Sequence, residues 1–307
     1  MRFRQKTGIA LTALITAAVV TGCAPQAPAG DDGTISVVAS TNVYGNIAEL
    51  IGGGLIEVTS IIDDPSQDPH SFEADARVQL AFSRADLVIE NGGGYDAFVG
   101  QLLSSLDDQP MTLSAVELSP LDLDPDSEHD HDHSANEHVW YDFPTMAAVA
   151  SGVSDALAKL DPEHEQQYEQ NAATLVAELD ALRERAHRLH PAGEVGVAVT
   201  EPVSLYLLEA IGLHNETPPA FSAAIEGGVE VSAATLDETL RLFERGAARI
   251  LVYNDQTTSP ETEALKAAAQ KAGAPIVSVT ELLPDGVDYV SWMNAVLDEL
   301  ESALAAV

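Results

Sequence analysis

The 307-residue chain is predicted to be an α/β protein with two lobes, each built on a mainly parallel sheet flanked by helices and joined by one long backbone helix. Three observations predict this fold class. Short apolar runs alternate with helical segments over residues 34–160, the same alternation recurs over residues 191–307, and the stretch between them lacks glycine. Alternating strands and helices are typical of βαβ units, which set strands parallel. The hydrophobic fraction of 46% is sufficient for a sizeable core.

The N-terminal segment is typical of a bacterial secretory signal. Its first six residues carry three basic side chains, and Ile9 to Val20 is an apolar stretch too short for a stable membrane span. The stretch ends at Val20-Thr21-Gly22-Cys23, which resembles a lipobox, where the cysteine is lipid-modified. We therefore predict a lipoprotein signal peptide over residues 1–22, then the lipidated Cys23 and a flexible Pro- and Ala-rich tether over 23–33. The alternative is an ordinary signal peptide followed by a free cysteine.

Three apolar runs in the first lobe, residues 34–160, are predicted to be strands, and a helix follows each of them. The strands are Ile35–Ala39, Ile56–Ile62 and Asp86–Glu90, and the helices are Asn42–Ile51, Asp75–Arg84 and Tyr95–Leu106. Residues 121–137 are too polar to contribute to the core and are predicted to form a His-rich loop.

Residues 161–190 are predicted to form the connecting helix, because leucines at 175, 179 and 182 have helical spacing and the only proline, Pro162, stands at the start. Two shorter helices with a break are the alternative.

The second lobe, residues 191–307, repeats the pattern of the first. Its strands are Val195–Val199, Arg249–Tyr253 and Pro275–Val279, and its helices are Pro202–Ala210, Pro260–Ala272 and Tyr289–Leu304.

The charge and cysteine content exclude several classes of function. Acidic residues outnumber basic ones by 49 to 14, for a net charge of −35, and so acidic a surface repels phosphate backbones. We therefore expect no nucleic-acid partner, whereas cations remain possible partners. The single cysteine excludes an internal disulfide and a thiolate metal cluster.

Four polar residues stand where the ends of predicted strands can bring them together. His70 follows the second strand in Asp68-Pro69-His70, and His138 lies in Asn136-Glu137-His138. Glu201 and Glu281 each follow a strand of the second lobe. Taken alone, each of these residues is more simply explained as a solvated loop residue or a helix cap. Together, two imidazoles and two carboxylates suit Zn²⁺, Mn²⁺ or Fe²⁺ better than Cu(I), which favours sulfur ligands.

A second feature also indicates metal. The tract Glu128–His133 alternates acids with His129, His131 and His133, and His-rich tracts of this kind often bind metals weakly. We expect these three histidines to be an auxiliary site of transient metal capture. A plain solvated loop and a pH-sensitive loop are the alternatives.

Several stretches together resemble the zinc/manganese-binding lipoproteins that are the solute-binding subunits of ABC metal importers, known as cluster A-I or cluster 9. They are Asp68–Glu73, Ala85–Gly92, Asn136–Asp142, Val199–Pro202 and Ser278–Glu281. The resemblance extends from Ile35 to the C-terminus. It implies a metal bound between the lobes by His70, His138, Glu201 and Glu281. The chain departs from the family in having Glu281 where an aspartate is usual and Glu137 where a proline is frequent.

The resemblance implies an extracytoplasmic protein, lipid-anchored to the bacterial cell membrane at Cys23, that carries one Zn²⁺ or Mn²⁺ at a high-affinity site as transported ligand. Its partners would be the metal ion and an ABC permease with its ATPase, and we expect a monomer. The His tract favours zinc and the 2-His, 2-carboxylate set favours manganese, so the metal stays open. A stiff connecting helix predicts small lobe movement.

Two other functions remain compatible with the sequence. The first is an extracytoplasmic adhesin or metal buffer with no role in transport. The second is a metal-dependent hydrolase, which would need a general base and an open coordination position. An H-E-x-x-H motif is lacking in the chain, so we do not expect an enzyme.

Overall fold

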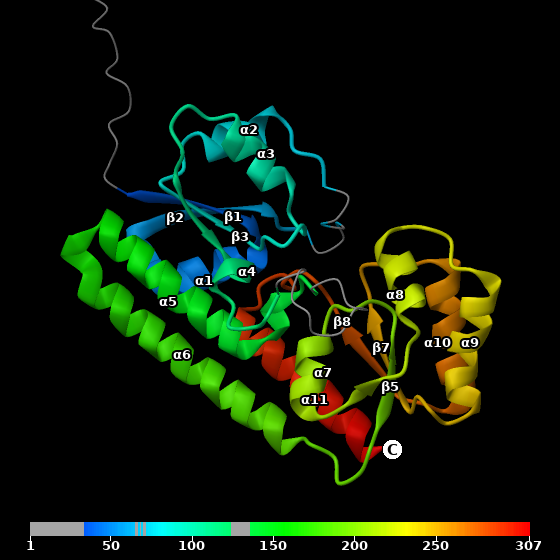
Figure 1. Ribbon diagram of the computed structural model, residues 1–307. Coiled ribbons are helices and arrows are strands. Elements are labelled where there is room, and N and C mark those ends of the chain that lie inside the picture. Colours follow the sequence, from blue (N-terminus) through cyan, green and yellow to red (C-terminus); the bar gives the residue numbers. More distant parts are fainter. Residues whose placement is uncertain (1–33, 65–66, 68, 70–71, 124–135) are drawn as a thin grey trace, which may run out of the picture. The chain divides into compact units, whose positions relative to one another are not determined.

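The computed structural model describes residues 34–64, 67, 69, 72–123 and 136–307. The first lobe is a four-stranded parallel sheet of order β2-β1-β3-β4 with helices on both faces (Figure 1). Its strands are β1 (Ile35–Thr41), β2 (Ile56–Ile62), β3 (Leu87–Glu90) and β4 (Met111–Ser114). Its helices are α1 (Asn42–Gly52), α2 (Ala76–Phe82), α3 (Phe98–Ser104) and α4 (Ala115–Leu118).

The second lobe repeats the same topology, with a parallel sheet of order β6-β5-β7-β8. Its strands are β5 (Gly196–Val199), β6 (His214–Asn215), β7 (Ile250–Asn254) and β8 (Ile276–Val279). Its helices are α7 (Leu205–Ile211), α8 (Pro219–Glu226), α9 (Ala233–Glu244), α10 (Pro260–Ala272) and α11 (Tyr289–Ala305). In each lobe the strand order reverses beside the first strand, and ligands of open α/β sheets bind at such switch points.

One long helix, α6 (Glu165–Arg188), connects the lobes. The helix α5 (Phe143–Leu160) packs along α6, which is the long helix that the sequence predicts (Figure 1). The α-helix is unbroken from Glu165 and is preceded by a short 3-10 turn over Pro162–His164. Asp161 stands just before this turn, and its carboxylate accepts a hydrogen bond from the Tyr168 hydroxyl at 2.9 Å and pairs with His164.

Both sheets are covered on both faces, which explains why their strands are apolar runs in the sequence. In β1, Val37 and Ala39 face the largest hydrophobic cluster, whereas Val38 packs with Phe82 and Val99 near α2 and α3. In β7, Val252 joins the same large cluster, and Leu251 packs in a separate cluster with residues of α8 to α10. The alternation along each strand thus divides the side chains between two layers.

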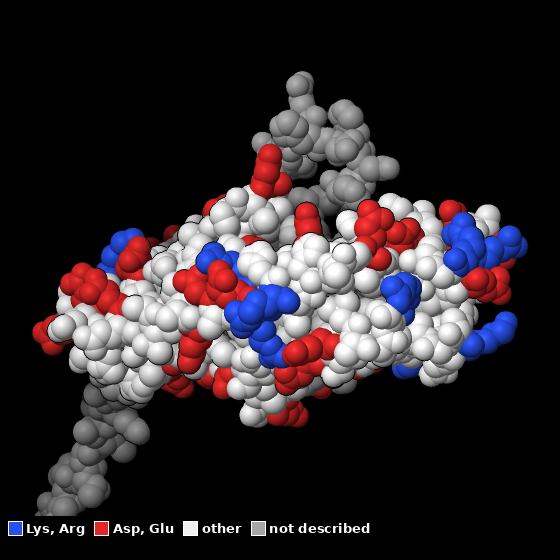
Figure 2. All heavy atoms as spheres, turned by 90° about the horizontal axis from the view of Figure 1, so that it is seen from below, with Lys and Arg blue, Asp and Glu red and all other residues white. Residues whose placement is uncertain are grey.

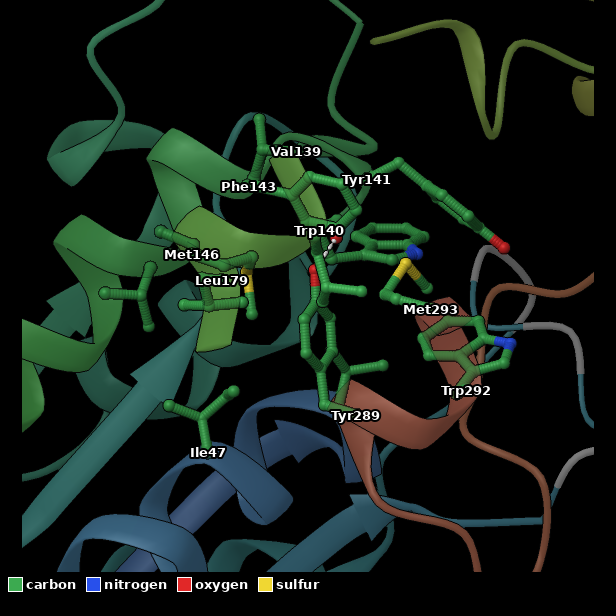
Figure 3. Close-up of a cluster of buried hydrophobic side chains, with 14 of the residues drawn as sticks. Ile47, Val139, Trp140, Tyr141, Phe143, Met146, Leu179, Tyr289, Trp292 and Met293 are labelled. Atoms are coloured by element: carbon green, nitrogen blue, oxygen red, sulfur yellow. Dashed lines mark hydrogen bonds between the residues drawn. The ribbon is translucent and has the colours of Figure 1, made fainter. Parts of the chain in front are cut away.

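The largest hydrophobic cluster belongs to both lobes. The aromatic residues Trp140, Tyr141, Tyr289 and Trp292 lie at its centre (Figure 3). The hydroxyl of Tyr289, the first residue of α11, donates to the backbone carbonyl of Trp140 at 2.6 Å. Residues Thr34–Val307 accordingly form one compact unit.

The edge strands β4 and β6 are elements that the sequence did not indicate. Thr112 in β4 and both residues of β6 are exposed, so neither strand has the apolar run that reveals a central strand. The helices α4, α8 and α9 were also not predicted. The segments 1–22 and 23–33, including Cys23, lie outside the described residues, so the signal peptide and tether stay predictions.

Acidic side chains are spread across the face drawn in Figure 2, with fewer basic ones among them. None of the helices in the described ranges is long and apolar enough to cross a membrane.

Candidate metal centre

Two buried carboxylates meet at the carboxyl ends of the second sheet. Glu201 follows β5, Glu281 follows β8, and Asn254 ends β7, the strand between them. The Nδ2 atom of Asn254 donates to Oε2 of Glu201 at 2.5 Å and to Oε1 of Glu281 at 3.0 Å. Glu201 is 5% exposed and Glu281 is 2% exposed. Two carboxylates that share one amide donor away from water favour a cation beside them.

The orientation of the Asn254 amide is fixed by its other contacts. Its Oδ1 atom accepts a hydrogen bond from the backbone N–H of Gln256 at 3.1 Å, which leaves Nδ2 directed at the carboxylates. The Asn254 backbone N–H donates to the Thr200 hydroxyl at 2.9 Å. Asn254 is therefore a rigid support for both glutamates, and the sequence analysis did not identify it.

A tyrosine of the first lobe reaches the same carboxylate pair. The hydroxyl of Tyr95 donates to Oε2 of Glu281 at 3.0 Å. Burial, followed by the charge of Glu281, raises the pKa of Tyr95 well above its ordinary value, so the hydroxyl keeps its hydrogen. Asp96 braces the preceding turn by accepting backbone N–H bonds from Asn91 at 2.6 Å and Gly92 at 2.9 Å. Gly92 has a φ of +78°, a conformation that favours glycine.

His138 lies in the segment that leads to α5 and is 1% exposed. Its Nδ1 atom lies 2.7 Å from Oδ1 of Asn136, whose Nδ2 donates to the carbonyl of Pro202 in the second lobe at 3.0 Å. Because an amide oxygen only accepts, Nδ1 carries the hydrogen and Nε2 of the neutral ring presents its lone pair. This is the arrangement that holds metal-binding histidines in place.

Two further acids lie beside His138. One ligand atom each of Glu137, His138 and Glu226 lie within 4.8 Å of one another, and Oε1 of Glu226 is 3.7 Å from Nε2 of His138. Burial, then the charges of Glu137, Glu201 and Glu281, raise the pKa of Glu226 to about 8. Sequence reasoning missed Glu226, which is the last residue of a helix that the sequence did not predict.

The remaining predicted site residues cannot be placed. His70 and the tract histidines His129, His131 and His133 lie outside the described residues. The neighbouring Gln67 accepts a hydrogen bond through its carbonyl from Nε2 of Gln256 at 3.2 Å. The Oε1 atom of the same Gln256 accepts from the backbone N–H of Glu281 at 2.5 Å, so Gln256 joins Gln67 of the first lobe to Glu281 of the second.

The described donors are an oxygen-rich set with one oriented imidazole, and hydrogen bonds of Tyr95 and Asn136 link their surroundings across the two lobes. His138 lies edge-on to the Tyr95 ring, with 5.9 Å between ring centroids, and Tyr95 binds Glu281. Carboxylate and imidazole donors suit divalent ions such as Zn²⁺, Mn²⁺ and Fe²⁺. Holding such an ion requires coordination by these donors and no covalent chemistry.

Comparison with known proteins finds relatives that are named for the metal ions they bind. The chain is 28% identical over 210 residues to the "Iron-binding protein YfeA" of Yersinia pestis, covering 67% of this chain and 65% of that protein. It is 24% identical over 298 residues to the "Manganese ABC transporter substrate-binding lipoprotein scaA" of Streptococcus gordonii, covering 92% and 94%.

The fold is that of solved periplasmic binding proteins. The structure of the periplasmic zinc-binding protein TroA from Treponema pallidum matches with a TM-score of 0.74 and 22% identity, over 88% of this chain and 99% of that one. A family profile described as "Zinc-uptake complex component A periplasmic" matches residues 37–303. The chain belongs to this family of extracytoplasmic solute-binding proteins of metal uptake systems, as the resemblance in the sequence predicts.

Proposed function

We propose that this protein captures one divalent transition-metal ion outside the cytoplasmic membrane and delivers it to an ABC permease for import. The observation that carries the proposal is the convergence of the buried Glu201 and Glu281 on Asn254, with Tyr95 joining Glu281 to the first lobe. The relatives named above, which bind iron, manganese or zinc, support a metal as cargo. A family of solute-binding proteins does not support the hydrolase that the sequence left open.

The proposed ligands are His138 from the first lobe and Glu201 and Glu281 from the second, with His70 as the fourth. His138 binds through Nε2, because Nδ1 is engaged with Asn136. Neutral imidazole and ionised carboxylates are the binding forms, so affinity falls as the solution becomes acidic. Lipid anchoring at Cys23, metal pre-capture by His129, His131 and His133, and the permease and ATPase as partners belong to the same proposal.

Calorimetric titration of the metal-free chain with Zn²⁺ and with Mn²⁺ tests the site. His138→Ala and Glu281→Ala should each weaken binding of the preferred ion by about a hundredfold or more, because each removes a ligand. His187→Ala is the matched control, since His187 is an exposed histidine on α6. If both ligand variants bind like the wild type, the assignment is wrong.

Transport is tested separately from binding. Metal uptake by membrane vesicles that hold the permease and ATPase should require this protein, and the Glu281→Ala variant should not support it. An adhesin or metal buffer would bind metal equally well and leave uptake unchanged.

A further inference from the structure

Glu226 is a carboxylate that the proposed four-ligand set does not use, yet it faces that site. It is the last residue of α8, and its Oε1 atom lies 3.7 Å from Nε2 of His138. The side chain is 23% exposed overall, but Oε1 is shielded from solvent and has no hydrogen-bond partner within the described ranges. A buried oxygen of this kind costs free energy unless something binds it.

The usual structural roles do not explain the position. A separation of 3.7 Å is too long for a hydrogen bond between Glu226 and His138. The carboxylate also stands at the C-terminal end of its helix, where the helix dipole is unfavourable for an acid. Glu137, whose ligand atom lies within 4.8 Å of those of His138 and Glu226, is a further acid rather than a counter-charge.

The spacing does fit two ligands of one ion. Donor atoms that bind a metal at about 2.1 Å lie roughly 3.0 to 3.5 Å apart when adjacent in its coordination shell. The His138 and Glu226 atoms are a few tenths of an ångström outside this range. Glu226 is also close enough to Glu201 and Glu281 for their charges to act on it. The His138 and Glu226 atoms therefore need to move only slightly towards each other to bind one cation.

We propose that Glu226 is an additional ligand of the transported ion and biases the site towards Mn²⁺ over Zn²⁺. This inference rests on the proposed function of the same site. With Glu201 and Glu281, it gives three carboxylates to one oriented imidazole among the described residues, a harder donor set than two carboxylates provide. Mn²⁺ favours oxygen donors and six-coordinate geometry, whereas Zn²⁺ is satisfied by four tetrahedral ligands, so an extra carboxylate benefits Mn²⁺ more.

The test compares Glu226→Gln with Glu230→Gln in the full chain. Both remove one acidic charge, but Glu230 is an exposed residue four positions beyond α8. Metal-free protein is titrated with Mn²⁺ alone and with Zn²⁺ alone, by competition against a chelator. We expect Glu226→Gln to weaken Mn²⁺ binding by about tenfold or more and Zn²⁺ binding by less than about threefold. Glu230→Gln should change neither.

X-ray absorption spectroscopy gives a second readout. Its result for the Mn²⁺-loaded wild type does not depend on whether a variant folds. It should show more than four nitrogen and oxygen donors, and Glu226→Gln should show one fewer. Unchanged Mn²⁺ affinity in Glu226→Gln, an equal loss for both ions, or four donors in the wild type would each overturn the inference while leaving a functional metal site. If the wild type binds neither ion, the proposed function fails together with it.

Discussion

Asn254 is the residue that decides how the two strand-end glutamates are held. A single Nδ2 atom contacts Glu201 at 2.5 Å and Glu281 at 3.0 Å, and the amide is locked by Gln256 on its other side. Groups that position metal ligands typically change affinity by 10- to 100-fold when they are removed. Asn254 is thus a positioning residue for the carboxylate pair rather than a ligand.

Asn254→Leu should weaken metal binding by about tenfold, because the two carboxylates lose the common donor that holds them in position against their mutual repulsion. It should also lower the stability of the metal-free protein, since two buried acceptors lose a partner. Asn171→Leu is the control, because Asn171 donates to the carbonyl of Ile51, where α6 meets α1. Calorimetry and thermal unfolding measure both effects. Equal affinity in the two variants would show that Asn254 has only a structural role.

Glu90, at the end of β3, gives a pH effect on stability that is separate from metal binding. Burial, then the charges of Asp96 and Glu117, raise the pKa of Glu90 to about 7 in the folded protein. The unfolded chain ionises this residue near its ordinary value of 4.5. The folded state therefore keeps a proton that the unfolded state releases, and the stability contributed below pH 4.5 is lost as the pH rises to 7.

Glu90→Gln should remove this loss, because glutamine carries no charge at any pH. At pH 8 the variant should be more stable than the wild type by about 1 kcal/mol, a value reduced for the partial exposure of Glu90. The difference should vanish by pH 4. Urea unfolding at the two pH values, with the exposed Glu57→Gln as control, measures it. A variant that is equally or less stable at pH 8 would contradict the assignment.

At the scale of elements, the sequence predicts best what is buried and regular. The central strands β1, β3, β5 and β7 are apolar runs because helices cover both faces of each sheet. The connecting helix was predictable because Leu175, Leu179 and Leu182 keep helical spacing and are all buried. The edge strand β6 has two exposed residues, so its pairing with β5 depends on the fold and leaves no local pattern.

The site residues differ in the same way in how well the sequence identifies them. His138, Glu201 and Glu281 follow or precede recognisable elements and match a family pattern, so the sequence could identify them. Glu226 lies at the end of the short helix α8, which has no pattern that the sequence analysis recognised. Only the tertiary fold brings Glu226 to 3.7 Å from His138. Asn254 was missed for a similar reason, because a polar residue at a strand end has no signal until its neighbours are known.

At the scale of the whole molecule, the two lobes are connected by more than α6. Asn42 of α1 makes two hydrogen bonds with the backbone of Leu283, donating at 3.0 Å and accepting at 2.9 Å. The backbone N–H of Tyr289 donates to Asn46 of α1 at 2.9 Å, and the Tyr289 hydroxyl binds the carbonyl of Trp140. The lobes also share one continuous hydrophobic core, part of which Figure 3 shows, so a wide rotation of one lobe would break several buried contacts at once.

The lobes should therefore change position little when metal binds, in contrast to hinged binding proteins that close around their ligand. Small-angle X-ray scattering of the metal-free and metal-loaded chain should give radii of gyration that agree within experimental error. A clear contraction of the wild type on loading would contradict this expectation, because the shared core could not then remain intact in both states.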